Sequence, residues 1–443
     1  MGAYMKKFFR KSFPFSIFLA SFLVLFFMPG YFGNNQVSAI DKDTYKNLRL
    51  FNQILDMVEK NYVEEVEQKT LIQGAIKGMV QTLDPHSTFM SADMYKELQV
   101  ETKGSFGGLG IVITILKDVL TVVSPIEDTP AFLAGVKAGD QIIKINDKST
   151  KGMTILEAVK KLRGPKNTTV TITIMRKDMK QPKDFKITRA IIQIKSVKYK
   201  TYGDIGYIRI LAFQGQTTDD LQNAIEEINK KIVPLKGLVL DLRNNPGGLL
   251  DQAVKISDIF IKSGVIVSTR GRIKSVAETY MAKNDGNEPV VPMIALVNEG
   301  TASAAEIVSG ALQDNGKAII LGTQTFGKGS VQTVIPLENG AALKLTTAKY
   351  YTPKGKSIQA EGIIPDIVVK YINPSDEKES IGTSTEMREK DLKGHIKGKN
   401  ETSKEVKEIS IKKASDDLKK DNQLKSAIDL LKSWEIFQGR NKG

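Results

Sequence analysis

The stretch Met293-Ile-Ala-Leu-Val297, continued by Asn298-Glu-Gly-Thr-Ala-Ser-Ala-Ala-Glu306, says most about the fold of this chain. Five consecutive apolar residues predict a buried strand, and the apolar spacing that follows predicts a helix over Ser303–Leu312. A buried strand that leads directly into a helix is typical of a sheet covered by helices. Ser303 therefore stands at a strand-to-helix turn, where the helix N-terminus stabilises negative charge.

Ser303 fits two roles. Ser303-Ala-Ala-Glu306 has the spacing of a capping box, in which the hydroxyl only satisfies a backbone N–H. The same position suits a nucleophile, because the helix N-terminus favours the oxyanion that follows attack. The chain has no cysteine and only two histidines, so a serine nucleophile without a suitable histidine needs another base. A buried lysine with a lowered pKa can take that role.

Lys328 is the candidate base, because it lies between two glycines just after the apolar strand Ala318–Leu321. Gln332, four residues further, is placed to orient the amine. Taken singly, Lys328 also fits a surface lysine and Gln332 a polar filler. Together with Ser303 they suggest a serine–lysine dyad.

A second candidate turn is Asp241-Leu-Arg-Asn-Asn-Pro-Gly-Gly248, which follows the expected strand Gly237–Asp241. Gly247 and Gly248 can present backbone N–H groups to a developing oxyanion, although a plain tight turn fits the same letters. The Walker pattern of a phosphate loop is missing.

Composition excludes several classes of protein. Without cysteine there is no catalytic thiol, disulfide framework or thiolate zinc site, and His86 and His395 are too few for a multi-histidine metal site. The formal net charge of the 443-residue chain is +14, but acids and bases alternate along it rather than forming a basic block. We therefore expect a solvated lysine-rich surface and no nucleic-acid partner.

The amino terminus predicts export. Basic residues precede the apolar run Phe13–Met28, and Val37-Ser38-Ala39 offers a small-residue cleavage pattern. A cleaved signal peptide and a retained membrane anchor both fit this run, since it is short for a membrane span. We therefore expect an exported protein, and the family resemblance stated below implies the periplasm or the outer face of the cytoplasmic membrane of a bacterium.

Periodicity along the rest of the chain predicts three further parts. Residues 40–100 are helical in pattern, residues from Gly104 form short β-rich runs, and residues from about Tyr202 to Tyr371 alternate strands with helices. The final apolar positions, Leu424, Ile428 and Leu431, predict an amphipathic helix that needs a surface to dock on.

Taken together, these motifs resemble the carboxy-terminal processing proteases, a family of serine peptidases also called tail-specific proteases. The resemblance runs from about residue 45 to 371, and several family-like motifs occur in the right order. They are Asp84-Pro-His-Ser, Phe106-Gly-Gly-Leu-Gly-Ile111, Leu162-Arg-Gly-Pro165, Asp241-Leu-Arg-Asn-Asn-Pro-Gly-Gly-Leu249, Gly300-Thr-Ala-Ser-Ala-Ala-Glu306 and Phe326-Gly-Lys-Gly-Ser-Val-Gln332. In the tail, Met387-Arg-Glu-Lys-Asp-Leu and Asp421-Asn-Gln-Leu are similar to members from Gram-negative bacteria.

The resemblance implies an α+β multidomain fold, in which a PDZ domain is inserted ahead of a protease core with crotonase-like or ClpP-like architecture. The expected parts are a leader (1–39), a helical segment (40–100), the PDZ domain (101–190), the core (191–373), a flexible linker (374–415) and a C-terminal amphipathic helix (416–443).

The resemblance also assigns roles. It implies Ser303 as nucleophile, Lys328 as general base and Gln332 as the partner of the lysine. It implies backbone oxyanion donors at Gly247, Gly248 and Ala304. No cofactor and no metal is implied.

In the PDZ domain, backbone N–H groups of Gly108-Leu-Gly-Ile111 can face a peptide carboxylate, and the strand that follows can accept an extended chain. A glycine-rich turn in an ordinary β-domain is the alternative for Gly108, Leu109, Gly110 and Ile111. Arg163 is a candidate sensor that couples peptide binding to the base, or a plain surface arginine. His86 is interpreted as a buried or capping histidine rather than as part of a Ser-His-Asp triad.

The function that follows is an exported serine endopeptidase acting on proteins with disordered or hydrophobic C-terminal tails. A homodimer through the helical ends, a lipoprotein adaptor and membrane association through the N-terminus are further expectations, although the helical faces also fit packing within one chain. A non-enzymatic PDZ adaptor is the alternative. A hydratase-like enzyme would need a carboxylate pair and a thioester site, and nothing between Gly237 and Gly329 singles out such a pair.

Overall fold

The computed structural model describes residues 42–176, 179–273, 277–372, 388–389, 394–396 and 421–440. The expected leader, residues 1–39, lies outside these residues, as does most of the expected linker, residues 374–415. The chain divides into two compact units, residues 1–74 and 75–443. Among the described residues, no helix combines the length and the apolar character that crossing a membrane requires.

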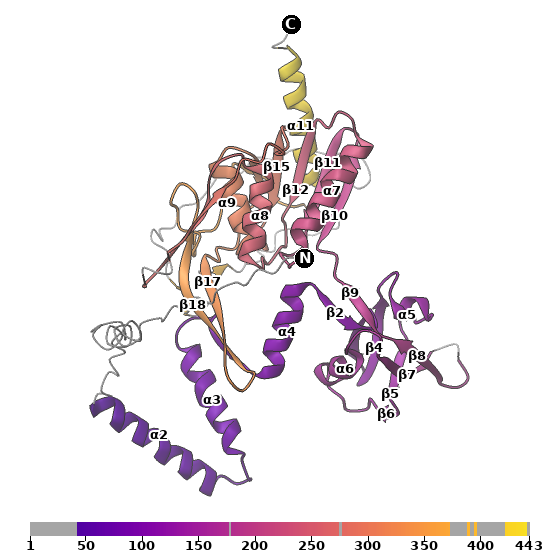
Figure 1. The fold of residues 1–443 in the computed structure, drawn as a ribbon, viewed down its shortest axis with the longest axis vertical. Helices are drawn as coiled ribbons and strands as arrows, with labels where there is room; N and C mark the ends of the chain where they lie inside the picture. Colours follow the sequence, from indigo (N-terminus) through magenta and orange to yellow (C-terminus); the bar gives the residue numbers. More distant parts are fainter. Residues whose placement is uncertain are drawn as a thin grey trace, which may run out of the picture. The chain divides into compact units, whose positions relative to one another are not determined.

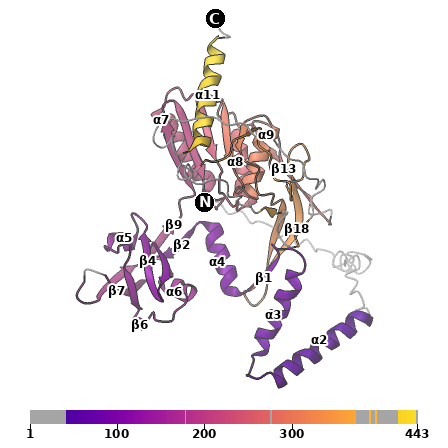
Figure 2. The same cartoon turned by 180° about the vertical axis from the view of Figure 1, so that it is seen from behind.

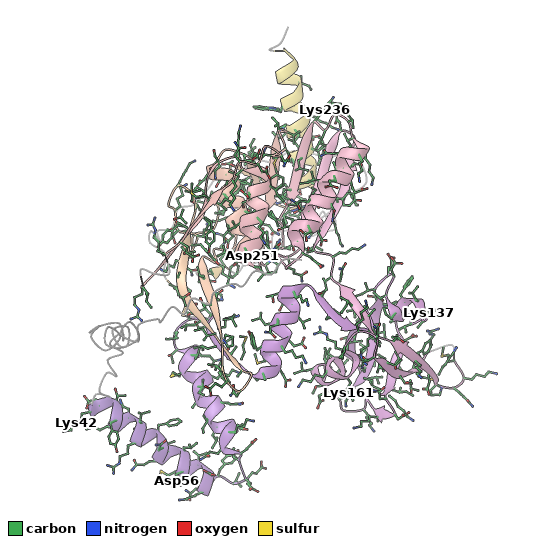
Figure 3. All side chains as sticks on the ribbon, in the orientation of Figure 1. Lys42, Asp56, Lys137, Lys161, Lys236 and Asp251 are labelled. Carbon is green, nitrogen blue, oxygen red and sulfur yellow. The ribbon has the colours of Figure 1, made fainter. Side chains whose placement is uncertain are left out.

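The first unit contains α2 (Lys42–Asn61) and the start of α3 (Gln68–Gln81). None of the α2 side chains is buried, and in Figure 3 they extend from the helix on every side, with Lys42 and Asp56 labelled. The apolar spacing that predicts this helix is therefore real, but most of its large apolar side chains stay exposed. These are Tyr45, Leu48, Leu50, Phe51, Ile54 and Met57.

Between α3 and the β-rich domain, the expected helical segment contains one strand that periodicity does not predict. Thr88–Met90 forms β1, which pairs antiparallel with β18 (Ala342–Tyr351). Helix α4 (Ala92–Lys103) then begins after Ser91, whose hydroxyl accepts a hydrogen bond from Met94 N–H. Gly104 ends this helix in the left-handed conformation.

The β-rich domain follows the expected strand pattern closely. Its main sheet has the order β3-β4-β5-β7-β8, with β6 paired to β5, and β2 pairs separately with β9. The elements are β2 (Ser105–Gly108), β3 (Ile111–Leu116), β4 (Val119–Pro125), α5 (Pro130–Leu133), β5 (Gln141–Ile145), β6 (Lys148–Ser149), α6 (Ile155–Leu162), β7 (Thr169–Met175), β8 (Lys183–Thr188) and β9 (Ala190–Gln193). Strand β3 is an edge strand, and α6 lies beside it.

The core is built on a six-stranded sheet of order β10-β11-β12-β15-β16-β19, parallel except for β10. Its elements are β10 (Val197–Tyr202), β11 (Ile205–Ile210), α7 (Thr217–Lys231), β12 (Gly237–Asp241), α8 (Leu250–Phe260), β15 (Met293–Val297), α9 (Ala304–Asp314), β16 (Ile319–Gly322) and β19 (Ile367–Val368). Strands β12 and β15 are buried throughout, as their unbroken apolar runs predict.

Helices cover both faces of this sheet. The views from opposite sides in Figure 1 and Figure 2 show α7, α8 and α9 on one face and α11 (Asn422–Arg440) on the other. Leu424, Ile428 and Leu431 of α11 pack on strand residues such as Val239 and Leu296. The amphipathic face of the last helix thus finds its partner within its own chain.

A second sheet of this unit was not predicted from the sequence. It is antiparallel, with the order β1-β18-β13-β14 and β17 paired to β18. Its remaining strands are β13 (Gly264–Gly271), β14 (Thr279–Ala282) and β17 (Ser330–Pro336). Strand β17 begins two residues after Lys328, so this sheet fixes the C-terminal side of the loop that carries the candidate base.

Candidate active site

Ser303 sits in a backbone conformation that a simple helix cap does not need. It is the N-cap of α9 with φ 55° and ψ −116°, whereas ordinary N-caps have extended backbone and positive φ is uncommon for residues other than glycine. The turn is crowded as well, because a Cβ on Gly247 would lie 2.8 Å from Ser303 Cβ. The two glycine-containing turns predicted from the sequence therefore meet at Ser303.

Glu306 joins the nucleophile turn to the loop of the candidate base. Its Oε2 accepts hydrogen bonds from Ser303 N–H at 2.7 Å and from Lys328 N–H at 2.9 Å. Its Oε1 accepts from the Thr325 hydroxyl at 2.5 Å and from Gly327 N–H at 2.8 Å. One carboxylate oxygen thus bridges the backbones of Ser303 and Lys328, which brings together residues far apart in the sequence.

Burial and hydrogen bonding act on this carboxyl in opposite directions. Glu306 is fully buried, and burial raises its pKa to about 7, although four donated hydrogen bonds favour the charged form. The capping-box spacing of Ser303 and Glu306 is present. It does not compete with the nucleophile interpretation, because the same glutamate also holds the Lys328 loop.

Lys328 has the environment that a neutral amine needs. Burial lowers the pKa of its amine, and the positive charge of Lys344 lowers it further, while Glu389 and Glu306 raise it. The amine forms no hydrogen bond to any described residue, so the Ser303–Lys328 contact is not made in this structure. Both flanking positions favour glycine, because a Cβ on Gly329 would lie 2.2 Å from Gln359 N and because Gly327 has a φ of 95°.

Gln332 does not contact the amine of Lys328 in this structure. Its Nε2 donates to the Ser330 hydroxyl at 2.8 Å and to the Ser330 carbonyl at 3.1 Å, within β17. Its proposed orienting role therefore stays a prediction.

The candidate oxyanion donors differ from one another. The N–H of Gly247 donates to Asn245 Oδ1 at 2.9 Å, so it is engaged within its own turn. In the described part of the chain, the N–H groups of Gly248 and Ala304 have no protein acceptor. Gly248 cannot carry a side chain, because its φ is 142° and a Cβ would lie 2.1 Å from Phe213 O. Of the three expected oxyanion donors, Gly248 and Ala304 therefore remain candidates with a free backbone N–H in the described structure.

The expected peptide-binding loop lies at the start of the open edge of β3. Gly108 pairs with Ala190 in the β2–β9 ladder, and the Leu109 side chain is in the domain core. The Leu109 and Gly110 carbonyls accept hydrogen bonds from Ala131 and Ile126 within the domain. Their carbonyls thus face inward, while Ile111 opens the edge strand.

Arg163 contacts helix α4 rather than the loop of Lys328. Its guanidinium donates to Glu97 at 2.5 Å and lies 4.4 Å from the centre of the Phe106 ring. The adjoining Gly164 packs against β2, since a Cβ on Gly107 would lie 2.1 Å from Gly164 O. Arg163 is therefore fixed at the junction of the β-rich domain with α4.

Two cavities lie near the carboxyl end of the core sheet. One of about 310 Å³ is lined by Asn244, Asn298 and Arg243, next to the turns of the site. A larger one of about 650 Å³ lies over β10 and contains no predicted site residue. Neither cavity is lined by a nucleophile next to a base. The Ser303 turn is therefore the better candidate for the active site than either cavity.

The sequence did not single out several residues that shape this site. The roles of Glu306 in bridging and of Asn245 in holding Gly247 come only from the geometry. Glu389 is another residue that the sequence did not single out. It falls in the expected flexible linker, but its side chain is fully buried, so at this residue the structure differs from the expectation. Among the described residues, no group of three or more His, Asp or Glu side chains is arranged to hold a metal ion.

Comparison with known proteins bears directly on this geometry. Residues 204–369 match the model of peptidase family S41, residues 107–187 match a PDZ domain, and residues 33–94 match the N-terminal domain of the activating protease CtpB. A carboxy-terminal-processing protease of Bartonella bacilliformis is 48% identical over 419 residues, 92% of this chain and 95% of the relative. The chain belongs to peptidase family S41.

Two further proteins are similar to the peptidase. A probable CtpA-like serine protease of Staphylococcus aureus is 40% identical over 76% of this chain and 68% of its own length. Among solved structures, a photosystem II D1 C-terminal processing protease is 29% identical, with a TM-score of 0.44 over 75% of this chain and 89% of that chain.

Family membership confirms the predicted class of protein. The peptidase is a serine peptidase of the carboxy-terminal processing type, with an α+β multidomain fold that includes a PDZ domain.

Proposed function

We propose that the peptidase is an exported endopeptidase that binds C-terminal tails of proteins in its PDZ domain and cleaves them with a Ser303–Lys328 dyad. The observation that carries the dyad is the shared acceptor Glu306 Oε2, which ties the backbone of the nucleophile to that of the base. The lowered pKa of the Lys328 amine supports the same assignment, because only the neutral amine accepts a proton.

In the proposed mechanism, Ser303 Oγ attacks the carbonyl carbon of the scissile peptide and its proton passes to Lys328 Nζ. The peptide C–N bond then breaks, and the protonated amine returns that proton to the leaving nitrogen. Water hydrolyses the resulting ester on Ser303 with Lys328 again as base. The N–H groups of Gly248 and Ala304 stabilise the oxyanion of each tetrahedral intermediate.

The dyad contact has to form before the reaction. Lysine has a long flexible stem, and catalytic hydrogen bonds are often absent until substrate is bound. We infer that Lys328 Nζ approaches Ser303 Oγ when a substrate chain occupies the site, with Gln332 as an orienting partner once its amide leaves Ser330.

The tail is held by the β-rich domain in this proposal. A substrate C-terminus adds to the open edge of β3 beside α6, and its carboxylate faces the backbone of residues 108–111. Arg163 is proposed to sense this occupancy, because it connects the turn after α6 to Glu97 of α4. A peptidase with Arg163→Ala that retained peptide-stimulated cleavage would exclude that role.

Export rests on the leader sequence, and we propose the periplasm or the outer face of the cytoplasmic membrane of a bacterium. A homodimer, a lipoprotein adaptor and membrane association through the N-terminus are proposed with it. The exposed apolar side chains of α2 favour a partner for that helix.

Incubation of the full chain with an unfolded protein, followed by mass spectrometry of the products, tests the proposed activity. Cleavage should depend on Ser303 and Lys328, and a fluorophosphonate probe should label Ser303. A Ser303→Ala protein that still cleaves would exclude the mechanism and leave a binding role for the PDZ domain.

A further inference from the structure

A buried cluster on the far side of the Lys328 loop is not used by the proposed mechanism. The Glu389 carboxylate has no exposed surface. His86 Nε2 lies 2.7 Å from its Oε1 and 2.8 Å from its Oε2, and Gln359 Nε2 donates to Oε1 at 3.0 Å. A carboxylate is seldom buried unless its oxygens are satisfied and its charge is matched. The cluster is therefore an organised contact rather than an incidental one.

Glu389 and the residue before it, Arg388, also hold the loop that carries the proposed base. Glu389 N–H donates to Phe326 O at 3.1 Å, and Arg388 donates to Gln324 Oε1 at 2.7 Å. Gln359 extends the contact, because its Oε1 accepts from Gly329 N–H at 3.0 Å. Residues 324–329 are thus held by Glu306 through one set of hydrogen bonds and by Arg388, Glu389 and Gln359 through another.

His86 is itself fixed, so it anchors the cluster to another part of the unit. Asp84 Oδ1 accepts from His86 N–H and from Ser87 N–H, both at 2.8 Å, and Asp84 Oδ2 accepts from the Ser87 hydroxyl at 2.7 Å. The Ser87 hydroxyl also accepts from Thr346 N–H of β18 at 3.0 Å. The turn before β1 is therefore tied to the sheet that follows Lys328.

We propose that Glu389, held by His86, is a positioning residue for the general base: together they clamp the loop 324–329 so that the Lys328 amine is presented to Ser303. The inference rests on the proposed role of Lys328. Catalysis then depends on Arg388 and Glu389 and on the Asp84-Pro-His-Ser turn. Without the clamp, this turn would have only a structural role.

The clamp has an electrostatic consequence that a purely mechanical contact lacks. The charged groups around the Lys328 amine are Lys344 on β18, Glu306 on α9 and Glu389, and the negative charge of Glu389 raises the pKa of the amine. His86, Gln359 and Arg388 are the other groups that face the Glu389 segment. In a plot of activity against pH, the rising limb marks the loss of the proton from Lys328. Removing the Glu389 charge should therefore move this limb toward lower pH. Loss of positioning should lower the rate at every pH.

The test compares Glu389→Gln, His86→Ala, His86→Gln and Arg388→Gln in the full chain, with Glu227→Gln as a control that removes an exposed ion pair with Lys230. Two readouts are followed against pH, namely cleavage of β-casein and the rate at which a fluorophosphonate labels Ser303. We expect Glu389→Gln to lower kcat about tenfold or more, since small misplacements of a catalytic group are costly, with KM little changed and the limb shifted to lower pH.

The other variants separate the two effects. Arg388→Gln keeps the carboxylate, so it should slow turnover without moving the limb. His86→Ala should slow both readouts, and His86→Gln, which retains a donor, should restore part of the rate. Glu227→Gln should match the unchanged protein. If Glu389→Gln does not fold, the two His86 variants decide.

The results distinguish the clamp from the dyad. The clamp would be overturned if Glu389→Gln kept normal rates and an unchanged rising limb of the pH profile. If Ser303→Ala were inactive in the same experiment, the proposed function would remain intact. Full cleavage by Ser303→Ala or Lys328→Ala would overturn the function itself. A lower melting temperature with unchanged kcat and pH profile in the folded Glu389→Gln protein would reduce Glu389 to a structural residue.

Discussion

Charges of both signs surround Lys328, so the protonation of this proposed base is set by several side chains rather than by burial alone. Burial and Lys344 favour the neutral amine, while Glu389 and Glu306 favour the charged one. An amine whose pKa is lowered is protonated and inactive below that pKa and neutral above it. Activity should therefore rise with pH through the lowered value.

Lys344→Gln tests this balance at the level of one residue. Removing its positive charge takes away one of the influences that lower the pKa of Lys328, so the rising limb of kcat/KM should move to higher pH. A pH series of kcat/KM for both proteins measures the shift. Lys349→Gln on the same strand is the matched control, and an unmoved limb in Lys344→Gln would argue against Lys328 as the titrating base.

Glu306→Gln tests the bridge between nucleophile and base. The carboxylate accepts four hydrogen bonds, and a carboxamide would turn an NH₂ group toward donors. We expect a loss of about 2 kcal/mol in the free energy of unfolding, since buried donors lose their acceptor, together with a large fall in kcat. Urea unfolding and fluorophosphonate labelling give the two values; native stability with native labelling would contradict the bridging role.

At the scale of elements, α11 completes the core. Its start is tied to the turn after β12, because Arg243 Nη2 lies 2.7 Å from Asp241 Oδ2 and 2.8 Å from Asp421 Oδ2. That turn continues into Gly247 and Gly248. The Asp241-Leu-Arg and Asp421-Asn-Gln-Leu motifs, quoted separately from the sequence, are therefore two halves of one ion-pair network, and the last helix supports the turn that faces Ser303.

Ile428→Ala should measure how much this docking contributes. Ile428 is 1% exposed against the sheet, and truncation of a buried isoleucine typically costs about 2–4 kcal/mol because a cavity remains. Trp434→Ala is the control on the same helix, since Trp434 is 52% exposed and should change stability by less than about 0.5 kcal/mol. Equal effects of the two substitutions in urea unfolding would show that α11 does not dock this way.

At the scale of the whole molecule, the peptidase combines a PDZ domain with a serine peptidase core in one chain, and we propose that the first binds the substrate tail that the second cleaves. The free C-terminal carboxylate of a substrate is the feature that the backbone of residues 108–111 is expected to recognise. The rate of cleavage should therefore depend on the chemistry of a substrate end that is not itself the scissile bond.

Amidation of the substrate C-terminus tests this dependence. Two peptides of the same sequence, one with a free carboxylate and one with a C-terminal amide, should differ about tenfold in kcat/KM, since hydrogen bonds to a charged group contribute about 1.5–3 kcal/mol. Fluorescence of an internally quenched peptide reports the rates. A third peptide with the carboxylate but a scrambled tail separates charge from side-chain recognition, and equal rates for the first two would exclude carboxylate capture.

Several elements could be predicted because their signals are local. The strand Met293–Val297 and the helix after Ser303 follow from an unbroken apolar run and from helical periodicity, and the structure has them at 293–297 and 304–314. The antiparallel sheet of β13, β14, β17 and β18 was missed because its strands are only partly buried and carry no clear alternation.

The sequence by itself determined the residue types that the chemistry requires, namely a serine at a strand-to-helix turn, a lysine between glycines and paired glycines after a buried strand. These depend on short-range sterics and composition. Only the tertiary structure decided that Glu306, which caps the turn of Ser303, also reaches the Lys328 loop, and that His86 meets Glu389. Such contacts join residues separated by long stretches of chain, and no local pattern encodes which buried donor will meet which acceptor.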